Sequence, residues 1–209
     1  MLFLGNWNHI ELARSSTGQF ESLEGKTMQQ IAIAQAKDPL DAFFDIAIEE
    51  DLQTGFVGKF FNNNDAGVAP LLKHPAGVVT LSDAGAHLIY MCDAGFGLHF
   101  LGHWVRETSE FTLQEGIRRL TSQPAGRFRI AGRGRLVTGA PADLMLFEPA
   151  TVGISRLRQT HDLPGGGARM VRDPVGVYGV WVNGTLVHDG TDYVKLEHGP
   201  GQVLTQFLP

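Results

Sequence analysis

The stretch Val78-Val79-Thr80-Leu81-Ser82-Asp83-Ala84-Gly85-Ala86-His87 decides which fold this sequence suggests. It begins after a break at Pro75 and Gly77, and its first four residues are apolar or β-branched. That pattern predicts a short strand at residues 78–81, buried on both faces as in the parallel sheet of an α/β fold. The carboxylate of Asp83 follows at once. Barrel enzymes place catalytic groups at this end of a strand.

Asp83 nevertheless allows two interpretations from the local sequence. It is a candidate catalytic residue and a candidate metal ligand because of its place after the expected strand. The alternative is that it caps the next helix, as Asp often does after a strand. His87 lies four residues further on, where it either lines a substrate pocket or bonds a backbone carbonyl. We carry Asp83 as the catalytic candidate and His87 as the substrate-binding candidate.

A second candidate site lies in the next segment. His99 and His103 are four residues apart, which places both imidazole rings on one helix face, where they could bind a metal. No third metal ligand lies at a recognisable spacing from this pair. The alternative is that the two imidazole rings are hydrogen-bonded at a helix boundary and bind no metal. Phe100 and Trp104 fall at helical spacing and are expected in the core. Cys92 lacks visible activation and is expected to be a small buried group.

Composition excludes several classes of protein. Of the 209 residues, 43% are hydrophobic and 19% are charged, as in an ordinary globular domain with a real core. The net charge is -5 and the basic residues are scattered, so nucleic acid is not an expected partner. No apolar run is long enough for a membrane helix, and the single cysteine favours the reducing cytoplasm. Serine nucleophile elbows, Walker loops and dinucleotide fingerprints do not occur.

The first half of the chain has helical patterns. Thr27 with Gln30 forms a capping box before a helix that we expect to reach about Ala36. Asp38 caps a second, amphipathic helix, and residues 49–51 are expected on its outside.

Two further helices are expected downstream. One covers residues 99–107, and the other opens at Thr112 with Glu115 and stops near Pro124. Glycines and prolines punctuate β structure from residue 132 onward. We expect a strand at residues 142–148 and a hairpin around Asn183-Gly184, a pair that tolerates the positive φ of a type I′ turn.

Residues 153–172 contain three consecutive glycines and read as an extended loop. The change in character divides the chain into residues 1–131, which are mostly helical, and residues 132–209, which are β.

Several segments taken in order resemble the C-terminal part of the amidohydrolase superfamily, in particular the N-acyl-D-amino-acid deacylases. These segments are residues 78–85, 102–107, 113–125, 139–147 and 180–184. The resemblance implies a (β/α)₈ barrel with zinc at its mouth and a β-sandwich built from both chain ends. Residues 1–131 would then close the barrel, and residues 132–209 would supply strands of the sandwich.

The resemblance also implies a role for Asp83 in the hydrolysis of an amide bond. At the end of the last barrel strand, its carboxylate would accept a proton from metal-bound water and then protonate the departing amine. The implied substrate is a small-molecule amide, and the implied cofactor of the complete enzyme is zinc.

The sequence departs from that family in three respects. A complete barrel takes about 250 residues, more than the chain has. No His-x-His pair occurs, so we expect no zinc to bind this chain alone. The deacylases hold the substrate carboxylate with an arginine soon after the aspartate, whereas here the first arginine after Asp83 is Arg106.

Three readings follow from these departures. The chain is a fragment or separately encoded half of a metal-dependent amidohydrolase, a non-catalytic remnant that binds a partner, or part of a cyclic-amide hydrolase. Unpaired barrel edges would favour self-association or an upstream barrel segment as partner.

Overall fold

The computed structural model describes residues 5–80, 82–89, 91–205 and 207, so Met1 to Leu4 lie outside it. The chain forms two compact units, Met1–Leu71 and Leu72–Pro209. The boundary expected after residue 131 falls within the second unit. Among the described residues, no helix combines the length and the apolar character needed to cross a membrane.

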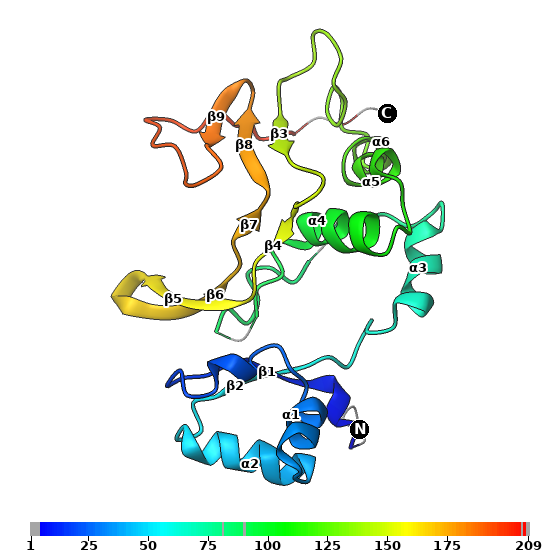
Figure 1. The fold of residues 1–209 in the computed structure, drawn as a ribbon. Coiled ribbons are helices and arrows are strands. Elements are labelled where there is room, and N and C mark those ends of the chain that lie inside the picture. Colours follow the sequence, from blue (N-terminus) through cyan, green and yellow to red (C-terminus); the bar gives the residue numbers. More distant parts are fainter. Residues whose placement is uncertain (1–4, 81, 90, 206, 208–209) are drawn as a thin grey trace. The chain divides into compact units, whose positions relative to one another are not determined.

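The first unit packs two helices on a two-stranded ribbon (Figure 1). Its elements are η1 (Trp7–His9), β1 (Ile10–Arg14), η2 (Glu21–Leu23), α1 (Met28–Gln35), α2 (Pro39–Glu49), β2 (Gly55–Gly58) and the greater part of α3 (Asp65–Lys73). The strands β1 and β2 are antiparallel, with Ile10 opposite Gly58. The buried core consists of Leu12, Met28, Ile31, Ala32, Ala42 and Ile46. The sequence patterns did not predict β1, or α3 with its internal Pro70.

Both expected N-caps of this unit are confirmed. The Thr27 side chain accepts from the Gln30 backbone at 3.2 Å, and the Gln30 side chain accepts from the Thr27 backbone at 2.9 Å. Asp38 accepts from the backbone N–H of Leu40 at 2.8 Å. These caps satisfy helix N–H groups that have no partner within the helix.

The expectation that residues 49–51 lie on the outside is wrong for Glu50. The residue is 2% exposed at the end of α2. The loop after β1 folds over its carboxylate and supplies hydrogen bonds, which a buried charge requires. Helical spacing alone did not reveal this loop.

The helices of the second unit are α4 (Phe96–His99), η3 (Phe100–Glu107), α5 (Leu113–Leu120) and α6 (Ser122–Arg127). The expected helix at residues 99–107 is present, and η3 has π geometry. Thr112 caps α5 by accepting from the Glu115 N–H at 3.2 Å, as expected. Pro124 does not end the helix but lies in the first turn of α6, where the missing N–H of proline costs little.

The C-terminal β structure is confirmed. Its elements are β3 (Leu144–Phe147), β4 (Gly153–Ile154), β5 (Arg158–Leu163), η4 (Pro164–Gly166), β6 (Gly167–Val171), β7 (Pro174–Val175), β8 (Val177–Val182) and β9 (Thr185–His188). An antiparallel sheet has the order β3-β8-β9. The turn between β8 and β9 has φ values of 48° at Asn183 and 81° at Gly184, as the expected hairpin requires.

The expectation of an extended loop at residues 153–172 is wrong. Strand β4 pairs with β7 and β5 pairs with β6, so the segment is a long antiparallel ribbon (Figure 1). Gly165 and Gly166, both with φ of 74°, reverse the chain at its tip. The strands are short or polar and lack an apolar alternation, which is why the sequence pattern did not indicate them.

The expected strand at residues 78–81 is also not formed. Residues 78–80 have no regular secondary structure, and Leu81 lies outside the described residues. A strand exists only through bonds to a neighbouring strand, and within the described part of the chain none pairs with this segment. Asp83 therefore follows an irregular segment.

Candidate functional site

Asp83 lies in an exposed turn. The Ala84 N–H donates to the Ser82 hydroxyl at 3.2 Å, and the Ala86 N–H donates to the Asp83 carbonyl at 2.9 Å. No helix begins within residues 84–89, so the structure does not support the alternative that Asp83 is a helix cap. The carboxylate of Asp83 is open to a reactant. Its catalytic role remains a prediction.

His87 belongs to the same exposed loop. Its φ of 49° lies in the left-handed region, and its carbonyl accepts from the Met91 N–H at 3.2 Å. The structure thus places the two candidates, Asp83 and His87, in one loop that precedes α4 and is described at residues 82–89 and 91–93. We call this segment the Asp83 loop.

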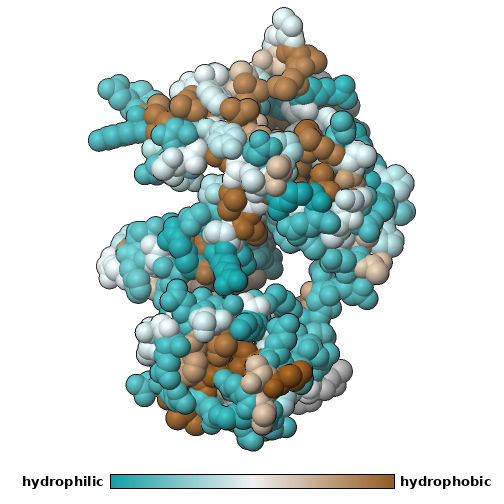
Figure 2. Space-filling view, viewed as in Figure 1, coloured by the Kyte–Doolittle hydropathy of each residue, from teal (hydrophilic) through white to brown (hydrophobic). Residues whose placement is uncertain are grey.

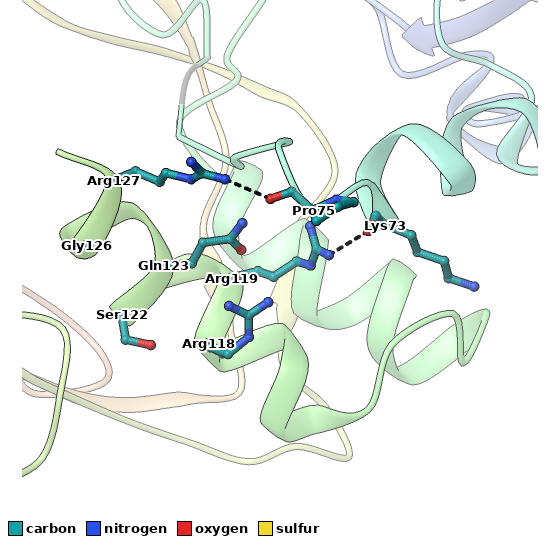
Figure 3. A pocket seen from close by; sticks show the side chains of 8 residues that line it. All are labelled: Lys73, Pro75, Arg118, Arg119, Ser122, Gln123, Gly126 and Arg127. Atoms are coloured by element: carbon teal, nitrogen blue, oxygen red, sulfur yellow. Dashed lines mark hydrogen bonds between the residues drawn. The ribbon is translucent and has the colours of Figure 1, made fainter.

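Side chains from α5 and α6 fix the chain upstream of the Asp83 loop. Arg119, Gln123 and Arg127 succeed one another at intervals of four residues and line an open cavity of about 410 Å³ (Figure 3). Each donates to backbone carbonyls of residues 72–77. The bonds run from Arg119 Nη2 to Lys73 O (2.9 Å), from Gln123 Nε2 to Gly77 O (2.8 Å) and from Arg127 Nη2 to Pro75 O (3.1 Å).

This cavity has a cationic lining, but its charged groups are largely engaged. Arg119 also bonds the carbonyl of Leu72, and Arg118 forms a bidentate pair with Glu115 at 2.6 and 2.7 Å. Lys73 pairs with Glu110. The lining therefore joins the helices to residues 72–77. The regular spacing of Arg119, Gln123 and Arg127 is the only signal of this role in the local sequence, and it was not among the predictions.

The ribbon of residues 153–175 fixes the downstream end of the Asp83 loop. The Met170 N–H donates to the carbonyl of Leu88 at 2.7 Å. Arg172 Nε donates to the carbonyl of Cys92 at 3.1 Å, and its Nη1 donates to Ser155 O at 3.0 Å. The sequence pattern does not predict this role of Arg172, because it indicates an extended loop at residues 153–172.

The second candidate site, the histidine pair, is held together as expected for one helix face. The rings of His99 and His103 stack with centroids 5.2 Å apart, and His103 Nδ1 lies 3.1 Å from Glu107 Oε2. The hydrogen bond from His103, together with one from Arg106, lowers the pKa of Glu107. Across the described residues, no three His, Cys, Asp or Glu side chains gather as a metal site would require.

The expected surroundings of this pair are largely confirmed. Phe100 and Trp104 are buried in the core. Cys92 is a free thiol of intermediate burial, less buried than expected.

The comparisons with known proteins all indicate one family. Residues 10–188 match the family model described as "Amidohydrolase family". A D-aminoacylase of Alcaligenes xylosoxydans xylosoxydans is 38% identical over 87 residues, which are 42% of this chain and 16% of that enzyme. An N-acyl-D-glutamate deacylase of the same organism is 36% identical over 104 residues, 50% of this chain and 19% of the enzyme. An uncharacterised protein of Mycobacterium tuberculosis is 30% identical over 184 residues, 83% of this chain and 30% of that protein.

Solved structures of two deacylases are similar at lower identity. A D-aminoacylase structure matches with a TM-score of 0.49 and 23% identity, covering 90% of this chain and 36% of the other. A Bordetella bronchiseptica N-acyl-D-glutamate deacylase, in complex with zinc and a phosphonate inhibitor, matches with a TM-score of 0.44 and 24% identity. That match covers 88% of this chain and 35% of the other. The chain thus spans about a third or less of the length of the proteins it matches.

Proposed function

Because the chain belongs to the amidohydrolase family, whose model matches residues 10–188, we propose that it carries the catalytic aspartate, Asp83, of a hydrolase of C–N bonds. The observation that supports this most directly is the family match itself, which spans the Asp83 loop. The exposed carboxylate on that loop is free of a structural role as a helix cap. Relatives named as D-aminoacylase and N-acyl-D-glutamate deacylase point to amide hydrolysis.

The proposed substrate class is a small-molecule N-acyl-D-amino acid. Arg106, the first arginine after Asp83, is bonded to Glu107 at 2.8 Å and to the carbonyl of Val152. We therefore do not assign recognition of the substrate carboxylate to Arg106. A cyclic amide is the alternative substrate, and His87 on the Asp83 loop remains the proposed substrate-binding residue.

The proposed architecture of the complete enzyme is a (β/α)₈ barrel with a β-sandwich. Residues 1–131 would belong to the closing part of the barrel, and residues 132–209 to the sandwich. The antiparallel sheet β3-β8-β9 is the structural feature that supports the second assignment. An upstream barrel segment is the proposed partner, and the cytoplasm is the proposed location.

The chemistry that we assign to Asp83 is proton transfer. Its carboxylate accepts a proton from the attacking water as the oxygen bonds to the amide carbon. The same proton then passes to the amide nitrogen as the C–N bond breaks, which leaves a carboxylic acid and an amine and regenerates the carboxylate.

The family implies zinc in the complete enzyme, but the described residues of this chain do not fit a zinc site. Catalytic zinc needs about three protein ligands. Among the described residues, no two further ligands stand beside Asp83, and the histidines and acids do not cluster. No step assigned to this chain depends on the metal.

Substitution of Asp83 tests the proposed function in the active assembly, in which this chain is joined to an upstream segment bearing a His-x-His pair. Asp83→Asn keeps the size of the side chain but cannot accept the proton. Turnover of N-acetyl-D-amino acids should fall by about 10² to 10⁴ while the unfolding midpoint stays unchanged. Asp93→Asn, the same change at the end of the same loop, is the matched control and should keep normal turnover.

Near-normal turnover of folded Asp83→Asn protein would show that this carboxylate is not catalytic. If neither the wild-type assembly nor the Asp83→Asn variant has turnover, and both still bind the substrate amide, the chain is a non-catalytic binding module and the proposal is wrong.

A further inference from the structure

The β4–β7 ribbon is seated on the helix that follows the Asp83 loop. Gly95 lies so close to Ile154 that an added Cβ would be 2.4 Å from its Cγ2 atom. At Gly102, an added Cβ would be 2.8 Å from the carbonyl oxygen of Val152. Contacts this close leave the base of the ribbon little freedom to move against α4 and η3. The ribbon is therefore a fixed support for whatever it touches.

From this base the ribbon contacts the Asp83 loop at two places. One is the backbone bond from Met170 to Leu88, and the other is the bond from the Arg172 guanidinium to the carbonyl of Cys92. Arg172 lies between β6 and β7, and its other bond crosses to Ser155 on the opposite leg of the ribbon. One side chain thus connects both legs of the ribbon to the loop.

Among its described residues, the Asp83 loop is mostly exposed and contains turns and bends but no helix or strand. Ordering each residue of such a segment costs conformational entropy. Bonds from a rigid neighbour therefore determine how narrowly the loop is confined.

We propose that Arg172 is a positioning residue that confines the Asp83 loop and thereby orients the Asp83 carboxylate. This inference rests on the proposed function. A misplacement of about 1 Å can cost on the order of 10²-fold in rate, so restraint at the loop's end affects the reaction. Arginine suits the role because its planar guanidinium donates in two fixed directions, here toward Cys92 and Ser155, whereas lysine offers a single point charge.

The chain contains its own reporter for this restraint, because Cys92 is its single cysteine. Reaction of the Cys92 thiol with an aromatic disulfide reagent measures opening of the loop without any substrate. In the full chain, Arg172→Ala should raise this rate about tenfold, since a lost bond to a charged donor frees the loop end.

Two further variants make the comparison specific. Arg158 lies on the same ribbon, but its side chain bonds only to Asp173, at 2.7 and 2.8 Å, among the bonds described. Arg158→Ala should therefore leave the rate of the Cys92 reaction unchanged. Arg172→Lys retains the charge without the two-way bonding, and should react faster than the wild type. Circular dichroism and the unfolding midpoint verify that each variant is folded.

The second measurement is turnover in the active assembly. Arg172→Ala and Arg172→Lys should both lower kcat by at least tenfold with KM little changed, and Arg158→Ala should alter neither. An unchanged Cys92 rate in Arg172→Ala would overturn the proposal, as would a faster rate with normal kcat. Failure of the proposed function is distinguishable, because the Asp83→Asn protein would then retain turnover whatever the Cys92 rates are.

Discussion

At the scale of single residues, Glu50 shows how a buried charge is compensated. Its carboxylate accepts from the backbone N–H groups of Ser16 and Thr17, both at 3.1 Å, and from the hydroxyl of Thr54 at 2.6 Å. The hydroxyls of Thr17 and Ser15 also donate to it. Burial raises the pKa of the Glu50 carboxyl, but these hydrogen bonds outweigh it and lower the pKa from 4.5 to about 2.

The direction of this shift sets the pH dependence of stability. Because the pKa is lower in the folded state, the ionised Glu50 stabilises the fold at any pH above about 4.5, and that contribution is lost as the pH falls toward 2. A shift of this size corresponds to about 3 kcal/mol. The thermal midpoint should therefore fall steeply between pH 4.5 and 2.

Glu50→Gln tests this interpretation. The amide cannot accept from all the donors around it, so the free energy of unfolding of the variant should be lower by about 2–3 kcal/mol at pH 7. The variant should also lose less stability than the wild type as the pH falls below 4.5. Glu49→Gln is the matched control, since Glu49 is exposed and bonded by Gln19 at 2.7 Å. Thermal unfolding from pH 7 to pH 2.5 measures both. An equal loss of stability between pH 4.5 and 2.5 in Glu50→Gln and in the wild type would contradict the assignment.

The candidate site was only partly predictable at this scale. Asp83 and His87 could be named because a carboxylate after an apolar run and a nearby imidazole are local features of the sequence. Arg172 could not, because its partner Cys92 lies 80 residues away and long-range backbone contacts leave no local pattern. Glu50 was misread for the same reason, since the loop that covers it is distant in sequence.

At the scale of elements, local signals predicted what local chemistry controls. The caps at Thr27, Asp38 and Thr112 and the turn at Asn183 depend on neighbouring residues, and the structure has all four. The expected strand at residues 78–81 is different, because a strand depends on partners that its own sequence does not specify. The expectation that this strand is buried on both faces was an inference about neighbouring strands, and it was wrong for the described residues 78–80.

In the helix formed by α4 and η3, alanine substitutions at two glycines should change the stability in opposite directions. Gly102→Ala places a Cβ 2.8 Å from Val152 O, so the ribbon must shift, at a cost of about 1–3 kcal/mol. Gly97→Ala meets nothing nearer than Leu120 at 4.0 Å and should stabilise the helix by about 0.5–1 kcal/mol. Chemical denaturation of both variants measures the difference. Equal effects at the two positions would show that the ribbon does not bear on the helix.

The join between α5 and residues 72–77 allows a comparison of neighbouring arginines. Arg119 is 5% exposed and donates to two carbonyls and to Glu115. Arg119→Ala should destabilise the second unit by about 2–4 kcal/mol, because it leaves part-buried carbonyls and the Glu115 carboxylate without their donor. Arg118→Ala removes an exposed partner of the same glutamate and should change the unfolding midpoint much less. Equal losses would mean that the charge of the pair matters and the carbonyl bonds do not.

At the scale of the whole molecule, the exposed apolar surface is the feature that most needs a partner. Strand β3 is an edge of its sheet among the described residues. Its Leu144, Met145 and Leu146 are all exposed, although successive strand residues face opposite sides. Hydrophobic side chains are visible over the region of β3 and β8 in Figure 2. An apolar edge open on both faces is a ready site for strand addition.

We therefore expect the chain to self-associate through β3, and a lysine on that edge to prevent it. Leu146, which is 55% exposed, can be changed to lysine with little effect on the core. A charge there disfavours strand addition, because pairing would bury it. Ile33, which is 71% exposed on α1, supplies the control Ile33→Lys. Sedimentation velocity at increasing concentration should show association for the wild type and Ile33→Lys but a monomer for Leu146→Lys. A wild-type monomer at every concentration would mean that β3 is tolerated in water and has no strand partner in a second copy of the chain.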